Sequence, residues 1–357
     1  MLQLALLLGG RSPEHEISLL SARNILEALD KTKYAVTCIG IDLDGAWRLL
    51  DHENWGERVS TAAPELALVP GRKGARIRRV DDGAFLPDFD IVFPITHGPG
   101  GEDGTLQGLL RMLDYPFVGP DVLGSSVAMD KDVAKRLLQA AGLQVAPWEC
   151  FQTHEADSVD FASLANKLGT PLFVKPANMG SSVGVHKVST AAELKAAVHD
   201  AFRFDRKIVI EAMIHGRELE CAVLGNVNPD VTSVGEVVIV SEEEYSYEAK
   251  YQSADAAQIV IPAELENNNL AALQIIARQA YIALCCEGLS RVDMFLTEEG
   301  DIYVNEINTL PGFTNISMYP KLWDHSELDN TALLDRLIQL AIARHEERNA
   351  LVSRLND

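Results

Sequence analysis

The stretch SRVDMFLTEEGDIYVNEIN, residues 290–308, carries the strongest fold signal in the chain. Two strand-like runs separated by Glu299-Gly300 predict a β-hairpin with a two-residue turn. Such a turn fixes the register and places Asp293 opposite Glu306, with their Cβ atoms about 4.5–5.5 Å apart. A three-residue turn would shift this pairing, so the register is a prediction for the structure to test.

Two carboxylates that face each other across a hairpin repel unless a cation lies between them. The same register pairs Arg291 with Asn308, which brings an amide oxygen to the same face. Carboxylate and amide oxygens suit Mg²⁺, which also takes phosphate oxygens from a nucleotide. We therefore predict a magnesium site formed by Asp293, Glu306 and Asn308, with a solvated hairpin face as the alternative.

The first third of the chain has an alternating pattern. Buried-strand runs at 3–8, 36–41 and 91–95 alternate with helical stretches, and one helix is expected from Ser12 as N-cap to about Leu29. Alternating strands and helices predict a parallel sheet and an α/β domain.

From Trp148 onward, short paired strands with few helices between them predict an α+β organisation. A single helix is expected before them, over 122–141. We expect an N-terminal α/β domain over 1–121, a central lobe over 122–215 and a C-terminal lobe over 216–357.

Composition argues against several classes of protein. The chain has 31 Lys and Arg against 52 Asp and Glu, a net charge of −21, so a nucleic-acid partner is not expected. No stretch approaches the roughly 18 apolar residues of a membrane span. The five cysteines lack C-x-x-C spacing, which favours buried thiols in a reducing compartment, and we expect a cytoplasmic protein.

The segment PLFVKPANMGSSVGVHKV, residues 171–188, contains a candidate anion-binding loop. A strand delivers Lys175, and the following loop contains Gly180, Ser181 and Ser182. Backbone N–H groups, hydroxyls and an ammonium group together can surround a phosphate. The segment lacks the GK[ST] sequence of a Walker A loop, and an ordinary flexible turn is the alternative.

Two other segments have the composition of ligand-binding connectors. In residues 208–225 a strand ends at Glu211, and an apolar connector leads to Glu218 at the start of the next strand. Such a connector can offer backbone groups to an adenine edge and a carboxylate to ribose, although apolar connectors also occur in cores. The tyrosine-rich acidic stretch 241–253 suggests a lid over a ligand, with a plain surface loop as the alternative.

The stretch ITHGPGGEDGTLQG, residues 95–108, places glycines after His97 and the acids Glu102 and Asp103 before a helix. Parallel sheets bind ligands beyond the carboxyl ends of their strands. This loop, together with Glu14 after the first strand, is therefore a candidate substrate contact. Helix capping and compensation of the helix dipole are the alternatives.

Together these motifs resemble those of the D-alanine–D-alanine ligases, a family of the ATP-grasp superfamily. The motifs in chain order are LLGGRSPEHEISLLSA, HGPGGEDGTLQG, FVGPDVLGSSVAMDK, FVKPANMGSSVGV, YEAKY, RVDMF and VNEINTLPGFTNISMYPKLW. The resemblance implies an N-terminal α/β domain plus two α+β lobes that hold ATP between them, often as a homodimer. It implies that two D-alanines are joined through an acyl phosphate for peptidoglycan synthesis.

The resemblance also implies residues for ATP and metal. Asp293, Glu306 and Asn308 would bind two Mg²⁺ or Mn²⁺ ions, and a monovalent cation is a further candidate. Lys131 and Lys175 would bind the phosphates of ATP. Glu211 would hold adenine together with Ala212 and Ile214, and Glu218 would bind the ribose. The implied ATP set is Lys131, Phe173, Lys175, Ser181, Ser182, Val183, Glu211, Ala212, Ile214, Glu218, Lys250, Phe295 and Asn305.

For the substrates, the resemblance implies that Glu14 receives the first alanine's ammonium group, while Arg291 and the Gly312 amide stabilise the reacting carboxylate. The Tyr251 hydroxyl would join Glu14 and Ser181 in a hydrogen-bond network typical of dipeptide-forming members. The implied catalytic set is Glu14, Ser181, Tyr251, Arg291, Gly312 and Ser317, and the substrate set is Glu14, His97, Arg291, Gly312, Ser317 and Met318.

Two other activities stay open at this point. One is a ligase of the same superfamily that acts on a different carboxylate and amine. The other is a nucleotide-binding protein that senses ATP without turnover.

Overall fold

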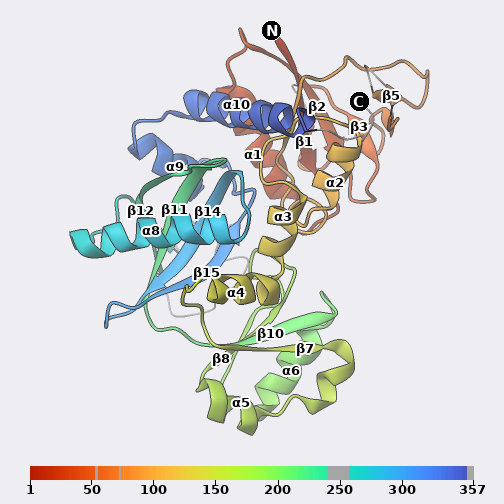
Figure 1. The fold of residues 1–357 in the computed structure, drawn as a ribbon. Coiled ribbons are helices and arrows are strands. Elements are labelled where there is room, and N and C mark those ends of the chain that lie inside the picture. Colours follow the sequence, from red (N-terminus) through yellow and green to blue (C-terminus); the bar gives the residue numbers. More distant parts are fainter. Residues whose placement is uncertain (53–54, 72–73, 75, 240–256, 352–357) are drawn as a thin grey trace.

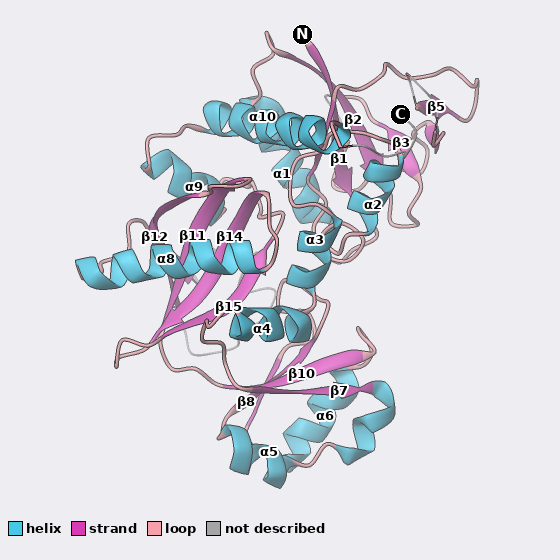
Figure 2. Ribbon diagram, in the orientation of Figure 1, coloured by secondary structure: helices cyan, strands magenta, loops and turns pink. Residues whose placement is uncertain are grey.

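The computed structural model describes the chain except residues 53–54, 72–73, 75, 240–256 and 352–357. Three β-sheets follow one another through the molecule, with helices over and between them (Figures 1 and 2). Among the helices of the described residues, none combines the length and apolar character that a membrane crossing requires.

The first sheet has six strands in the order β5-β4-β3-β2-β1-β6. The predicted parallel pairing holds at its centre, where β1 pairs with β2 and β6, but β3, β4 and β5 extend it as antiparallel strands. These edge strands are three or four residues long and were not predicted. The bounds are β1 Leu2–Gly9, β2 Tyr34–Ile41, β3 Trp47–Leu49, β4 Glu65–Leu68, β5 Ile77–Arg79 and β6 Ile91–Pro94.

Two helices cover opposite faces of this sheet. Leu4, Leu6 and Leu8 pack in one core with α1 (His15–Ala28), while the alternate residues of β1 pack in another core with α2 (Thr105–Met112). Because successive side chains of a strand point to opposite faces, β1 is buried on both sides.

The start of α1 differs from the prediction. The Ser12 carbonyl accepts a hydrogen bond from the His15 N–H (3.2 Å), and the Ser12 hydroxyl accepts one from the Glu14 N–H (3.1 Å). This extra turn moves the helix start to His15 and puts Glu14 at the N-cap position. The Glu14 side chain makes no capping hydrogen bond, so its carboxylate can take part in contacts outside the helix.

The second sheet is antiparallel, in the order β7-β10-β8-β9. Apolar residues on one face form a core with helices α5 and α6. This arrangement agrees with the predicted α+β organisation. The bounds are β7 Trp148–Gln152, η1 Thr153–Ser158, α5 Phe161–Leu168, β8 Leu172–Pro176, β9 His186–Val188, α6 Ala191–Ala201 and β10 Lys207–Ala212.

The single helix expected over 122–141 is two helices, α3 (Val122–Met129) and α4 (Lys131–Ala140). Asp130 separates them in extended conformation, and its carboxylate accepts a hydrogen bond from the Val133 N–H (3.1 Å). Asp is a favoured N-cap residue, so the prediction was wrong because it read Asp130 as a helix-interior residue.

The third sheet has the order β13-β12-β11-β14-β15, and all neighbours are antiparallel. Helix α8 packs on one face (Figure 1). Helices α9 and α10 follow the sheet. The bounds are β11 Arg217–Gly225, β12 Asp230–Ile239, β13 Ala257–Val260, α8 Asn267–Ala283, β14 Gly288–Leu296, β15 Ile302–Asn308, α9 Met318–His325 and α10 Asn330–Asn349.

The pairing predicted for the hairpin is confirmed. Asp293 lies opposite Glu306, and Arg291 lies opposite Asn308. The two carboxylates therefore share one face of the third sheet, as the metal-site hypothesis requires.

The turn between these strands is not the predicted one. The Thr297 N–H donates to the Asp301 carbonyl (2.9 Å), which leaves three residues in the loop instead of two. This extra residue would shift the register, and indeed Met294 pairs with Val304. A β-bulge at Asn305 then restores the predicted register toward the carboxylates, because it adds one residue to β15.

The C-terminal helix α10 is held to the segment between α2 and α3 by a buried arginine. The Arg344 guanidinium donates to the carbonyls of Gly119 (2.6 Å) and Phe117 (2.8 Å). Leucines of α10 also share the core of β1 and α1. The first and third sheets are thus packed together through the C-terminal helices.

We expect Arg344→Met to lower the free energy of unfolding by about 3 kcal/mol, because two buried carbonyls lose a charged donor. Denaturant titration followed by circular dichroism measures the change. The control is Arg348→Met, one turn further along α10, for which we expect a change within about 0.5 kcal/mol. Equal losses in the two variants would contradict this role of Arg344.

Candidate functional site

Predicted site residues from distant parts of the chain meet beside the open face of the third sheet. The Ser181 hydroxyl, in the β8–β9 loop, donates a hydrogen bond to the Glu14 carboxylate. The Lys131 ammonium, at the start of α4, lies 3.7 Å from the Glu306 carboxylate and donates to the Met179 carbonyl (2.6 Å). These contacts join residues of all three predicted domains.

The face of the third sheet is apolar at one end and charged at the other. Ala222, Leu224 and Leu289 lie at the apolar end, in the core shared with α9 and α10. Glu220 and Asp293 lie opposite each other on β11 and β14 at the charged end. Strand alternation puts all five residues on the same face. Among the residues that the structure describes, the core formed with α9 and α10 covers the apolar end of this face and not the charged end.

Arg291 neutralises part of this charge. Its guanidinium donates two hydrogen bonds of 2.7 Å to the Asp293 carboxylate and lies 2.9 Å from a Glu220 oxygen. The Asn308 amide also donates to Asp293 (3.0 Å). Bidentate pairing of this kind fixes the carboxylate in one orientation.

A divalent cation fits this donor set if further ligands from outside the protein complete its coordination shell. Among the residues that the structure describes, no group of three or more His, Cys, Asp and Glu side chains is arranged to hold a metal ion. Asp293 and Glu306 supply two neighbouring carboxylates, and Asn308 adds an amide next to them. Two carboxylates suit Mg²⁺ when substrate phosphates complete its shell, but they do not make an all-protein cage.

Glu102, in the loop predicted as a candidate substrate contact, lies beside the site, although it was not named among the implied site residues. Its carboxylate accepts hydrogen bonds from the Gly98 N–H (2.7 Å) and the Leu310 N–H (3.1 Å). Burial raises the pKa of Glu102 to about 8, and the nearby Glu14 charge adds to the rise. Burial also raises the pKa of Glu14, although the Ser181 hydroxyl opposes that shift.

Two glycines let the loops approach Glu14. A Cβ atom at Gly98 would lie 2.5 Å from a Glu14 carboxylate oxygen, and one at Gly180 would lie 3.0 Å from the same atom. The adjacent Ser181 and Ser182 have φ of 50° and 59°, a left-handed conformation that L-residues seldom adopt. Strain of this kind typically persists where a functional loop is held in one shape.

Glu211 lies between two ammonium groups. It is buried at the end of β10, with Lys175 at 2.8 Å and Lys135 at 3.3 Å from its two oxygens. Burial alone would raise the pKa of Glu211, but the two ammonium groups outweigh it and lower the pKa to about 2. Lys135 was not predicted; its one signal is that it follows Lys131 by one helical turn in DKDVAKR.

The other predicted nucleotide residues that the structure describes are all half-buried. The Ala212 N–H already donates to the Pro147 carbonyl (2.9 Å), so only other groups of Ala212 can contact a base. Lys250, like Tyr251, lies outside the described residues. The half-buried set is Phe173, Ser182, Val183, Ala212, Ile214, Glu218, Phe295 and Asn305.

His97 is buried between α1 and the segment after β15. Its Nδ1 donates to the Leu310 carbonyl (3.0 Å), because a carbonyl can only accept, and its Nε2 lies 3.2 Å from the Ser21 hydroxyl. Burial lowers the pKa of His97 to about 4, so the ring is neutral at pH 7. His97 therefore joins parts of the site without contributing charge.

Gly312, Ser317 and Met318 lie together at the start of α9. The Ser317 hydroxyl accepts from the Thr314 N–H (2.9 Å), and a Cβ atom at Gly312 would lie 2.8 Å from that hydroxyl. Met318 directs its side chain into the core against Gly235, so only its backbone can contact a substrate.

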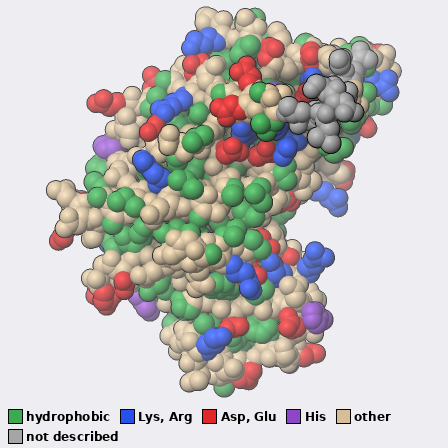
Figure 3. All heavy atoms as spheres, in the orientation of Figure 1, with side chains coloured by type: hydrophobic (Ala, Val, Ile, Leu, Met, Phe, Trp, Pro, Cys, Tyr) green, Lys and Arg blue, Asp and Glu red, His purple; other side chains and the backbone are tan. Residues whose placement is uncertain are grey.

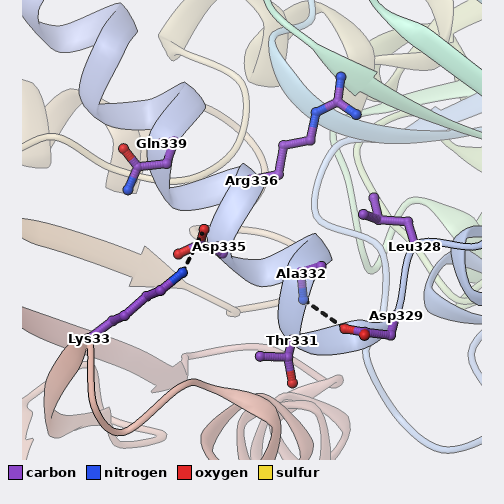
Figure 4. Close-up of a pocket in the computed structure, with 8 residues that line it drawn as sticks. All are labelled: Lys33, Leu328, Asp329, Thr331, Ala332, Asp335, Arg336 and Gln339. Atoms are coloured by element: carbon purple, nitrogen blue, oxygen red, sulfur yellow. Dashed lines mark hydrogen bonds and ion pairs between the residues drawn. The ribbon is translucent and has the colours of Figure 1, made fainter.

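A surface pocket on the other side of the C-terminal helices contains none of the predicted site residues (Figure 4). The pair of Lys33 and Asp335, 3.2 Å apart, lies across it, and Arg336 and Asp329 also line it. Its charges largely compensate one another. On the face shown in Figure 3, lysines and arginines are likewise scattered among acidic side chains.

Comparison with known proteins covers both halves of the chain. The family model described as D-ala D-ala ligase N-terminus matches residues 3–120, and the model described as D-ala D-ala ligase C-terminus matches residues 137–339. The D-alanine--D-alanine ligase of Shouchella clausii is 49% identical, with 99% of this chain and 98% of that protein covered. D-alanine--D-alanine ligase A of Salmonella typhimurium is also 49% identical, with 98% of each covered.

Solved structures show the same similarity. The D-alanine-D-alanine ligase from Coxiella burnetii has a TM-score of 0.86 at 38% identity and covers 98% of this chain and 96% of its own. The VanG D-Ala:D-Ser ligase from Enterococcus faecalis has a TM-score of 0.84 at 34% identity and covers 95% and 99%.

We expect the stability of the protein to fall as pH rises toward 8, and Glu102→Gln to weaken this dependence. The folded pKa of Glu102, about 8, lies above its ordinary value of 4.5, so the folded state binds more protons between these values. Its contribution is full below pH 4.5 and is lost as pH rises through about 8. Denaturant midpoints measured between pH 4.5 and 8 give the slope of stability against pH.

The exposed Glu16→Gln on α1 serves as the control and is expected to keep the wild-type slope. A slope in Glu102→Gln that matches the wild type would show that Glu102 does not titrate in this range.

Proposed function

The chain belongs to the D-alanine–D-alanine ligase family, and from this we propose how its described residues perform the reaction. It is an ATP-dependent ligase that joins two D-alanines for peptidoglycan synthesis. The observation that carries this conclusion is the match over nearly the whole chain at 49% identity.

We propose an ATP-grasp arrangement in which the second and third sheets hold ATP between them. One sheet lies in each of the ranges 1–121, 122–215 and 216–357, which supports a division into these three domains. The half-buried nucleotide candidates come from strands of both the second and the third sheet. This distribution supports a ligand held between the two.

For ATP, we propose that Lys131 and Lys175 contact the phosphates, together with the hydroxyls of the β8–β9 loop. Both ammonium groups lie beside carboxylates now, and phosphate oxygens offer the same kind of acceptor. Glu211 is ionised and can accept a hydrogen bond from the adenine amino group. Glu218 lies on the same face of the third sheet as Asp293 and would accept from ribose hydroxyls.

We propose that Asp293, Glu306 and Asn308 hold Mg²⁺ or Mn²⁺, two ions in all, and that a monovalent cation is a further ligand. Such ions neutralise charge on the terminal phosphates during transfer. Arg291 keeps Asp293 oriented through its two hydrogen bonds. Lys131 beside Glu306 places a second positive charge near the phosphate that is transferred.

We propose that Glu14 binds the ammonium group of the first D-alanine. Glu14 is buried near Glu306, and these two negative charges favour a cation at this position. Its hydrogen bond from Ser181 holds the carboxylate toward the loop. His97 would line the same pocket as a neutral ring.

We propose two chemical steps. The first D-alanine carboxylate attacks the γ-phosphate, which gives an acyl phosphate and ADP; the amine of the second D-alanine then attacks the carbonyl and phosphate leaves. Arg291 and the Gly312 amide would stabilise the developing oxyanion, a contribution of about 3 kcal/mol for one donor. Ser317 and the Met318 backbone would bind the second carboxylate at the start of α9, where helix N–H groups favour an anion.

Three further assignments are proposals from the family alone. Tyr251 and Lys250 would belong to a lid, and both fall outside the described residues. The active form would be a homodimer. A cytoplasmic location would match the use of ATP and the five free cysteines.

We expect purified protein with ATP and Mg²⁺ to release phosphate and form D-alanyl-D-alanine when D-alanine is supplied. D-Lactate, D-serine and L-alanine are tested as second substrates; D-serine is included because one structural relative is a D-Ala:D-Ser ligase. We expect D-alanine to be used best at neutral pH. Preference for D-lactate or D-serine would indicate a different ligase, and ATP binding without phosphate release would indicate a sensor.

We expect Glu306→Ala to abolish phosphate release, a loss of at least about a hundredfold, because a metal ligand and the partner of Lys131 are both removed. Circular dichroism should show a folded protein, since the side chain is partly exposed. Glu299→Ala, in the exposed turn of the same hairpin, is the control and should keep wild-type activity. Near-normal release by Glu306→Ala would remove Glu306 from the site.

A further inference from the structure

Helix α4 directs two lysines, one turn apart, toward opposite ends of the proposed nucleotide site. Lys131 lies beside Glu306 and the β8–β9 loop. Lys135 lies beside Glu211, and its side chain is only 2% exposed. The first lysine faces the phosphate end of the site, and the second faces the base end.

Lys135 is held firmly in this position. Its ammonium group donates to the Ala146 carbonyl (3.3 Å), lies 3.3 Å from a Glu211 oxygen, and is 5.7 Å from the centre of the Trp148 ring. Burial lowers the pKa of Lys135, and the Glu211 charge opposes that shift. Burying an ammonium group costs free energy that an apolar side chain of similar size would not require.

Charge balance alone does not explain this lysine. Glu211 already has an ammonium partner, because Lys175 lies 2.8 Å from its other oxygen. Lys175 is 16% exposed, and its proposed phosphate contact would draw it away from Glu211 when ATP binds. Lys135 is then the partner that stays with the carboxylate.

We propose that Lys135 is a positioning residue for base recognition, which holds the Glu211 carboxylate so that its remaining lone pairs face the exocyclic amino group of adenine. This inference rests on the proposed assignment of Glu211 to adenine. A carboxylate has about four acceptor positions, and Lys135 uses one of them, on one oxygen of Glu211. Because Lys135 stays when Lys175 moves to the phosphate, that oxygen remains tethered and the other oxygen is free to accept from the base.

The consequence is discrimination between nucleotides. An ionised carboxylate only accepts hydrogen bonds, so it favours a base with an amino group over a base with a carbonyl at the same position. Sites built around a fixed hydrogen bond reject analogues that lack the matching group. Lys135 therefore sets the preference for ATP over inosine triphosphate, which carries the carbonyl.

The test compares steady-state kinetics with ATP and with inosine triphosphate, at saturating Mg²⁺ and D-alanine. For Lys135→Met we expect the KM for ATP to rise about tenfold and the preference for ATP to fall about tenfold, with kcat changed less than about twofold. A calorimetric titration with ATP gives the affinity without turnover. Arg136→Met, the exposed neighbour on α4, is the control and should behave as the wild type.

Two further variants separate this inference from the proposed function. Glu211→Gln should also lose the preference, because its amide can donate to a carbonyl. An unchanged preference in Glu211→Gln would show that Glu211 does not contact adenine, and the assignment itself would fail. Loss of preference in Glu211→Gln with none in Lys135→Met would overturn the role of Lys135 alone.

The double variant, Lys135→Met with Glu211→Gln, covers a failure of Lys135→Met to fold, because it removes both charges of the buried pair. We expect it to match Glu211→Gln alone, since both residues act through one contact. Additive losses would overturn the proposal. An equal fall in kcat with both nucleotides, at unchanged preference, would also overturn it.

Discussion

Repulsion between neighbouring carboxylates is the constraint on which the site depends. Glu14, Glu102 and Glu306 come from three distant segments. The Glu306 charge raises the pKa of Glu14, and the Glu14 and Glu306 charges raise the pKa of Glu102, although burial is the larger cause. They can lie together because a proton on Glu102, whose pKa is about 8, removes one negative charge at pH 7, and nearby positive charge balances the others. Lys131 supplies part of that charge, and the substrate's ammonium group and a divalent ion would supply the rest. The charge arrangement of the protein alone thus favours the ligands of a ligase.

The third sheet shows how strand geometry produces this arrangement. One face of β11 and β14 is apolar where the C-terminal helices pack on it and acidic beyond those helices. Because every second residue of a strand points to the same face, the core residues and the site residues lie along the same side of the sheet. The hairpin keeps its two carboxylates on that face through two irregularities that cancel. The longer turn shifts the register by one residue, and the bulge at Asn305 shifts it back.

The sequence was sufficient for features that depend on neighbouring residues. A two-residue turn predicted that Asp293 faces Glu306, and the pairing is correct although the turn is not, because the longer turn and the bulge together leave the pair unchanged. The local sequence pattern also predicted one continuous helix across Asp130, which is in fact the N-cap that separates α3 from α4. Lys135 was missed, and the role of Glu102 in its candidate loop was not specified, because their partners lie far along the chain: Glu211 for Lys135 and the Leu310 amide for Glu102.

Helix α4 would couple the second and third sheets through a nucleotide that binds between them as proposed. Its first residue donates a backbone hydrogen bond to Ala177 after β8, and Lys207 of β10 pairs with its cap, Asp130, at 2.5 Å. The helix is therefore attached to the second sheet, while the Lys131 side chain reaches Glu306 on the third. A phosphate bound by Lys131 would replace a weak contact of 3.7 Å with a shared anion and its metal ions. The bound ligand would therefore strengthen the contact between the second and third sheets, where the protein alone has an excess of acidic side chains.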